Sequence, residues 1–215
     1  MNRIGTSNGI FTGLPKGIKG ISREDINVVI LGTSPLSRSY YADSLFRDAS
    51  TPTCWSTDSQ TPSRNVSEEG KQSTRCLDCT HDILGSAANG GRACRFFQKL
   101  AVSFEGSLDK VYQLHVSAVS IFGKRGNSLR GYSRFLKQHD TAASTLFTRI
   151  YFEEDVEAPK LLFYPKRPLE EEEMSIVVEV ISSEAATTAM DTDTYVGIDL
   201  TESPFSINES GFTTT

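Results

Sequence analysis

Apolar residues in this chain fall into short runs separated by polar stretches, a pattern that predicts several short strands. Residues 26–31 form a β-branched run that ends at glycine and proline, as is typical of a strand. In residues 111–121 every second side chain is apolar, which predicts a strand with one apolar face. Further strands are predicted at residues 95–104, 146–153 and 160–164, while residues 37–46 fit either a strand or a turn of helix.

Two segments have the spacing of helices. Residues 127–139 carry apolar side chains at i, i+3, i+6 and i+7, which predicts an amphipathic helix with Asn127 or Ser128 as its cap. These apolar residues are Leu129, Tyr132, Phe135 and Leu136. Residues 168–181 begin with a proline and four glutamates, which favour the start of a helix. Because residues 174–181 are rich in β-branched side chains, a strand is the alternative there.

The two ends of the chain lack an apolar period. Residues 1–22 are rich in Gly, Ser and Thr, which predicts a flexible arm, and residues 182–215 predict a disordered acidic tail. We expect one domain over residues 23–181, with residues 54–94 as an insertion. Its predicted class is mainly β with α (α+β), and an OB-like Greek-key barrel with a loop subdomain fits the order of elements best.

Charge is distributed unevenly along the chain, although the net charge is only −5. Residues 71–137 carry eleven basic and four acidic side chains, a net charge of +7. Residues 151–215 carry three basic and fifteen acidic side chains, a net charge of −12. This asymmetry indicates a body that binds a polyanion and an acidic tail.

All four cysteines lie within residues 54–94, with the spacing C-x21-C-x2-C-x14-C. Thiolates two residues apart can bind one ion from a tight turn, and two more complete the tetrahedron of a structural zinc site. We therefore predict a structural Zn²⁺ that makes residues 54–94 a zinc-binding loop subdomain, with the ligands Cys54, Cys76, Cys79 and Cys94. Two disulfides, a redox-active CxxC, or His81 as a ligand in place of Cys54 are the alternatives.

Basic and aromatic side chains are interleaved in the positive segment, as in proteins that track phosphates and stack bases. We predict single-stranded DNA as the ligand, and the alternative for each residue is core packing or a solvated surface. The candidate nucleic-acid-binding residues are Trp55, Arg92, Arg95, Phe96, Lys99, Lys124, Arg125, Arg130, Tyr132, Arg134 and Lys137.

Motifs of other classes are missing from the sequence. There is no phosphate-binding P-loop, no nucleophile elbow and no H-E-x-x-H, so we do not expect an enzyme. There is no apolar run of about 18 residues and no secretory signal peptide, so we expect no membrane partner and no secretion. The expected location is intracellular, which means the cytoplasm of the host cell if the protein is viral.

The cysteine pattern, the predicted barrel and the acidic tail together resemble phage-type single-stranded DNA-binding proteins, which combine an OB fold with an embedded zinc knuckle. The resemblance covers about residues 54–181, and Gly85-Ser86 and the motifs Cys76-Leu77-Asp78-Cys79 and Gly91-Arg92-Ala93-Cys94 carry it. Relatives often use one histidine ligand and end in a denser acidic run than Phe212-Thr213-Thr214-Thr215.

The resemblance implies a replication or recombination accessory that coats single strands and recruits replication proteins through its tail. Two other classes of function stay open. One is a zinc-knuckle adaptor or transcription regulator that docks on a protein partner. The other is a virion structural protein that associates with itself.

Overall fold

The apolar run at residues 26–31 lies in the interior of a curled sheet, as part of strand β3 (Asp25–Thr33) of the computed structural model. The structure describes residues 1–18, 21–42, 51–123, 126–154 and 159–194. The other strands in this part of the chain are β1 (Asn2–Ser7), β2 (Ile10–Thr12), β4 (Ser37–Tyr40), β5 (Cys54–Ser56), β6 (Arg95–Phe104), β7 (Ser107–Ser117), β8 (Leu146–Phe152) and β9 (Leu161–Pro168). The helices there are α1 (Ala118–Ile121), α2 (Leu129–Gln138), α3 (Glu171–Ile181) and α4 (Glu184–Met190), with 3-10 turns at Cys76–Asp78, Thr80–Asp82 and Ala143–Thr145.

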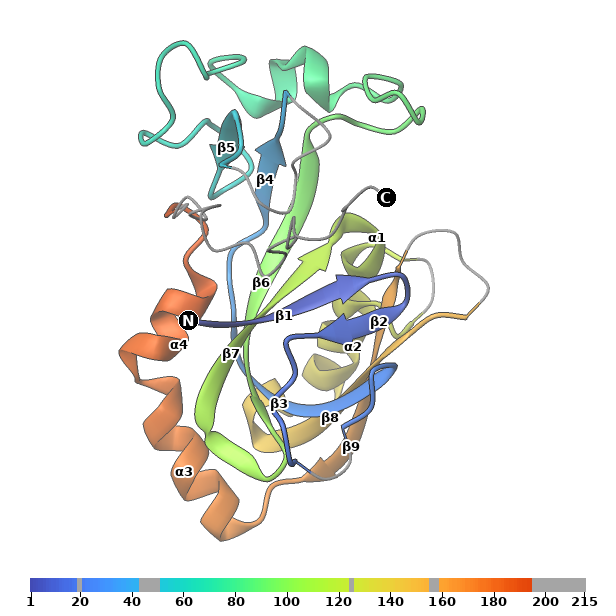
Figure 1. Cartoon of the computed structure of the whole chain (residues 1–215), viewed down its shortest axis with the longest axis vertical. Helices are drawn as coiled ribbons and strands as arrows, with labels where there is room; N and C mark the ends of the chain where they lie inside the picture. The colour runs from blue at the N-terminus through green and yellow to red at the C-terminus, as the bar shows by residue number, and fades with distance from the viewer. Residues whose placement is uncertain (19–20, 43–50, 124–125, 155–158, 195–215) are drawn as a thin grey trace, which may run out of the picture.

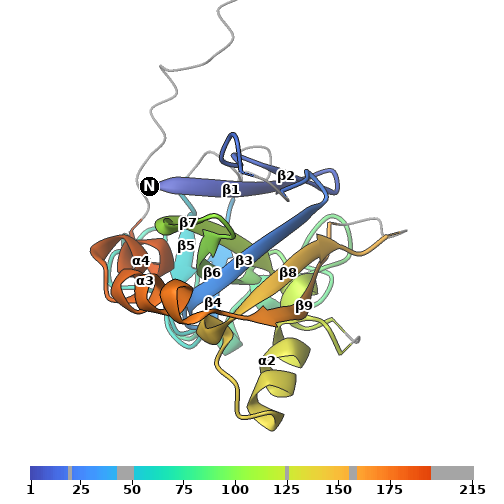
Figure 2. The ribbon, with the colours of Figure 1, turned by 90° about the horizontal axis from the view of Figure 1, so that it is seen from below.

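The strands form one curled sheet with the order β2-β1-β7-β6-β3-β8-β9, and β4 joins the start of β6 to β5. Paired strands are antiparallel except β1 and β7, which run parallel. The short strands β4 and β5 and the chain around the cysteines lie at one end of the sheet (Figure 1). Helices α3 and α4 follow one another along one side of the molecule (Figure 1), away from α2 (Figure 2). The predicted mixed class is therefore confirmed at the level of a curled half-barrel with helices.

Apolar side chains are buried on both faces of this sheet. Val28 and Ile30 of β3 belong to a core that includes side chains of α2, whereas Val29 and Leu31 belong to a second core under α3 and α4. Because both faces of β3 are covered, its sequence from Val28 to Leu31 is a continuous apolar run and does not alternate with polar residues.

Both predicted helices form, and α3 excludes the strand that was the alternative for residues 174–181. Ser128 caps α2, since its hydroxyl oxygen accepts a hydrogen bond from the backbone N–H of Gly131 at 3.3 Å. Leu129 and Leu136 are buried as the helical spacing predicts, but Phe135 is 40% exposed. The prediction that Phe135 packs with the buried face of this helix is thus wrong.

The ends of the described chain differ from the sequence prediction. Residues 2–12, expected as a flexible arm, form β1 and β2, and they bury Ile4 and Phe11 in the core. Part of the expected tail forms α4, and residues 195–215 of that tail lie outside the described residues. The strand expected at residues 111–121 ends at Ser117, where α1 begins. In the first two cases pairing and packing against distant strands stabilise segments that have little local pattern.

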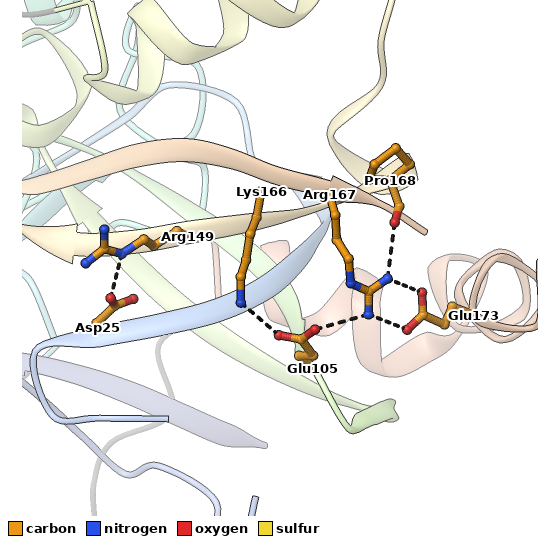
Figure 3. A network of polar contacts seen from close by, with 7 residues as sticks. All are labelled: Asp25, Glu105, Arg149, Lys166, Arg167, Pro168 and Glu173. Atoms are coloured by element: carbon orange, nitrogen blue, oxygen red, sulfur yellow. Dashed lines mark hydrogen bonds and ion pairs between the residues drawn. The ribbon is translucent and has the colours of Figure 1, made fainter. Parts of the chain in front are cut away.

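Charged side chains fix the start of α3 to the sheet (Figure 3). The guanidinium of Arg167, near the end of β9, donates to both carboxylate oxygens of Glu173 at 2.7 and 2.8 Å. It also donates to Glu105, between β6 and β7, at 3.1 Å, and Lys166 lies 3.3 Å from the same carboxylate. Glu173 in turn accepts from the backbone N–H of Glu170 at 2.8 Å, as in a capping box.

We expect Glu173→Gln to lower the free energy of unfolding near neutral pH, by up to about 1 kcal/mol because the ion pair is partly exposed. Hydrogen bonds from Arg167 lower the pKa of the Glu173 carboxyl. The stabilisation is therefore complete above the usual glutamate pKa and is lost as the pH falls through the lowered value. Urea unfolding at several pH values should show that the variant and the wild type converge in acid. A constant difference would contradict this, and Glu171→Gln, an exposed neighbour, is the control.

Candidate functional site

The four cysteines come from different elements and line one cavity. Cys54 begins β5, Cys76 begins a 3-10 turn, Cys79 follows that turn, and Cys94 directly precedes β6. Strand β4 brings them together, because it pairs with β5 on one side and with β6 on the other. The cavity measures about 20 Å³, which is room for one water-sized particle and far less than a small-molecule site requires.

The cysteines around this cavity are buried, at Cys76 and Cys79, or half-buried, at Cys54 and Cys94. All four cysteines are free thiols in the structure, with no disulfide. Burial raises the pKa of Cys54 and of Cys76, and it raises the pKa of Cys94 to about 12. The thiols of Cys54, Cys76 and Cys94 are therefore neutral at pH 7 unless a cation in the cavity stabilises the thiolate form.

A buried arginine stands beside the thiols. Arg38 of β4 lines the cavity, and its guanidinium lies 2.7 Å from the Asp82 carboxylate and 4.0 Å above the ring of Phe96. Within the described residues its buried Nε–H has no hydrogen-bond acceptor. Its positive charge lowers the pKa of Cys76 and Cys94, against the larger effect of burial. A thiolate cluster in the cavity would supply both an acceptor and a counter-charge for this group.

Four thiols surround a space of ionic size, and the positive charge of Arg38 would offset part of the charge of the thiolates. The donor set therefore fits a zinc ion in type and number. In the part of the chain that the structure describes, no group of three or more His, Cys, Asp or Glu side chains is already arranged as a metal site. The thiols therefore share a cavity without converging on one point. The ligand set stays a prediction.

His81, the alternative ligand, is engaged elsewhere. Its ring stacks on Tyr40 with the ring centres 3.9 Å apart, and its Nε2 lies 3.2 Å from the Gln72 side-chain oxygen. It is not among the residues that line the cysteine cavity. The geometry thus favours Cys54 over His81 as the fourth donor.

Three of the predicted nucleic-acid-binding residues are buried and do not form a surface. Trp55 is 8% exposed, and its indole N–H donates to Asp193 at 2.8 Å. Burial lowers the pKa of Lys99, whose ammonium donates to a backbone carbonyl oxygen. The Tyr132 hydroxyl lies 2.6 Å from that of Thr148, and burial raises the pKa of this tyrosine. The sequence prediction that these three contact nucleic acid is not supported by where they lie.

The other candidates lie at or near the surface, apart from Lys124 and Arg125, which are outside the described residues. Arg92 is partly exposed, and its guanidinium donates to the Asp82 carboxylate at 2.9 Å. Arg95 is exposed on β6, on the opposite side of the strand from Phe96. The basic stripe, which we define as Arg130, Arg134 and Lys137, is exposed along one face of α2 at i, i+4 and i+7.

An aromatic pair adjoins this stripe. The rings of Phe96 and Phe122 meet edge to face with their centres 5.5 Å apart, and the guanidinium of Arg130 lies 5.5 Å from the Phe122 ring. Phe122, at the end of α1, is 37% exposed. The sequence shows Phe122 within the interleaved basic segment, but only the tertiary structure places it against Phe96 and α2.

Comparisons of the chain with protein-family models, with curated proteins and with solved structures return no match. Among the described residues, no helix is long and apolar enough to span a membrane.

Proposed function

We propose that this chain binds single-stranded DNA with little sequence preference and carries a structural zinc ion. The observation that supports this best is the aromatic pair of half-buried Phe96 and exposed Phe122 beside the basic stripe of α2. The stripe spans about 10 Å along the helix and can follow consecutive phosphates. The rings can stack on bases, which tolerates any base because every base has a π-face.

The zinc ion of this proposal is structural. Cys54, Cys76, Cys79 and Cys94 would hold it, and the ion would cross-link β5, the 3-10 turn and the start of β6. Because Phe96 lies two residues after Cys94, that cross-link would also fix the aromatic pair. A zinc ion closed by four thiolates has no position for a substrate water, so we propose a binding protein and not an enzyme.

We extend the proposal to the finer points of the fold and the biological role. The curled sheet would be an OB-like Greek-key barrel with residues 54–94 as its zinc-binding subdomain. The protein would coat single strands during replication or recombination. The remainder of the predicted acidic tail, residues 195–215, which lies outside the described residues, would recruit replication proteins.

We expect Phe122→Ala to weaken binding to oligo-dT by about tenfold, since one stacked base contributes about 1–3 kcal/mol. Phe135→Ala is the matched control, because Phe135 is also exposed on α2 but lies on another face from the basic stripe. Fluorescence anisotropy with labelled oligo-dT at two salt concentrations measures both. Equal affinities of the Phe122 variant and the wild type would contradict the role of the aromatic pair. No binding by the full chain or by residues 1–194 would contradict the function itself.

A protein–protein adaptor is the second candidate, favoured by one observation. Leu77, Ile83 and Leu84 around the two 3-10 turns of the cysteine loop are 67%, 60% and 74% exposed. Exposed apolar side chains of this size gathered on one loop are typical of docking surfaces. An adaptor would bind no oligo-dT, and its partner complex would be lost on Leu84→Ser.

A further inference from the structure

The segment 184–194, called the strap below, closes the face of the sheet opposite α2. Ala186 and Ala189 of α4 are 1% and 0% exposed and belong to the core that contains Val29 and Ala101. The Met190 side chain lies directly over Gly32 of β3, where even a methyl group would collide with it. The strap is thus a packed part of the fold and not the beginning of a solvated tail.

Polar groups of the sheet also depend on the strap. The Gln113 side-chain amide donates to the carbonyl oxygen of Ala189 at 2.8 Å, and the Lys99 ammonium donates to that of Asp191 at 2.6 Å. Gln113 and Lys99 are 5% and 7% exposed, so water cannot readily replace these acceptors.

The last turn of the strap reaches the cysteine loop through one carboxylate. Asp193 accepts hydrogen bonds from the indole N–H of Trp55 at 2.8 Å and from the amide of Asn65 at 2.8 Å, and the Ser63 hydroxyl donates to it as well. All three donors come from residues 55–65. That segment begins directly after Cys54.

The same segment is tied to the cysteine cavity. Trp55 lines the cavity beside the four thiols, and its carbonyl oxygen accepts from the backbone N–H of Ser63 at 2.8 Å. The backbone N–H of Cys76 donates to the carbonyl oxygen of Gln60 at 2.8 Å. Residues 55–65 therefore touch the thiols on one side and Asp193 on the other.

We propose that the strap and the metal site are coupled through Asp193: an ion held by the four thiolates orders residues 55–65, and these residues hold the strap in place. Loss of the ion would loosen residues 55–65, withdraw the donors from Asp193, and release the strap from the sheet. Because such coupling is reciprocal, a strap that cannot bind residues 55–65 must lower zinc affinity by the same factor. This inference rests on the metal site proposed above.

Asp193→Ala tests the coupling, with Asp193→Asn as a milder variant and Glu184→Gln as the control. Glu184 lies on the exposed side of α4. Its substitution by glutamine removes one negative charge from the strap, as Asp193→Ala does. Trp55 is the only tryptophan, so its emission reports directly on the contact. Zinc affinity is measured by competition with a chelator, and hydrogen exchange is followed at residues 184–194 with and without zinc.

We expect zinc-loaded Asp193→Ala to show red-shifted Trp55 emission, about tenfold faster exchange in the strap, and zinc affinity lowered by about tenfold. Removing zinc from the wild type should also speed exchange in the strap. A zinc-loaded variant with unchanged exchange and affinity overturns the coupling, as does a chelated wild type whose strap keeps its protection. A wild type that binds no zinc overturns the proposed metal site itself. A chain that binds zinc with the same affinity and the same strap protection after substitution of Asp193 overturns only the coupling.

Discussion

A chain with Cys79→Ser is expected to lose its zinc ion and the folded structure of residues 51–94. Few apolar side chains stabilise that segment; among those described, the buried ones are Pro52, Trp55, Val66, Cys76 and Cys79. A segment of this size with so small a core needs a cross-link or a metal to fold. In zinc-finger peptides a structural zinc contributes about 10–16 kcal/mol, and a serine hydroxyl in place of one thiolate forfeits much of this.

The measurement is zinc content per chain, with thermal melting and oligo-dT affinity measured on the same sample. Thr80→Ser is the matched control, because Thr80 is the exposed neighbour of Cys79 and begins the next 3-10 turn. The Cys79 variant should lose zinc, melt earlier and bind DNA more weakly, since the position of Phe96 depends on the cross-link. Unchanged melting and DNA affinity in that variant would refute the structural role of the site.

Ending the chain after Ser182 is expected to cost on the order of 5 kcal/mol of stability, which is comparable to the whole stability of many domains. The shorter chain lacks the carbonyl oxygens that accept from Lys99 and Gln113. Each buried donor deprived of its acceptor costs about 1–3 kcal/mol, and more if it is charged. The core beneath Ala186 and Ala189 would also become exposed to water.

Ending the chain after Thr194 is the control, because it keeps every described contact of the strap. Urea unfolding should give the same free energy of unfolding for residues 1–194 and for the full chain, and a much lower one for residues 1–182. Equal stability of all three would show that the strap contributes little. Any test of whether the acidic tail competes with DNA should therefore use residues 1–194, since the shorter chain would confuse competition with unfolding.

Local patterns predicted most of the regular elements. Strand β6 has the bounds that the sequence suggested, and α3 begins where the glutamates follow Pro168. These predictions succeeded because the hydrophobic period and the capping residues act within a few positions of one another. Strands β1 and β2 and helix α4 were missed, because Gly, Thr and Ala carry little period and these segments are stabilised by distant strands.

Burial of individual side chains was the weakest part of the prediction. Trp55 and Lys99 stand in polar or alternating sequence, yet both are covered by the strap, more than 90 residues further along the chain. Phe135 has the spacing of a core residue but remains exposed. Whether an amphipathic side chain is covered depends on which distant segment packs over it, and no local pattern carries that information.

The sequence by itself determined the succession of the central strands and helices along the chain, the charge asymmetry and the grouping of the four cysteines, because each depends on residue types at short spacing. The tertiary structure decided what these features can do. It placed the thiols around one cavity through the pairing of β4, set Phe122 against Phe96, and closed the sheet with a C-terminal strap. Such contacts between distant segments arise only when the sheet curls and both of its faces are covered.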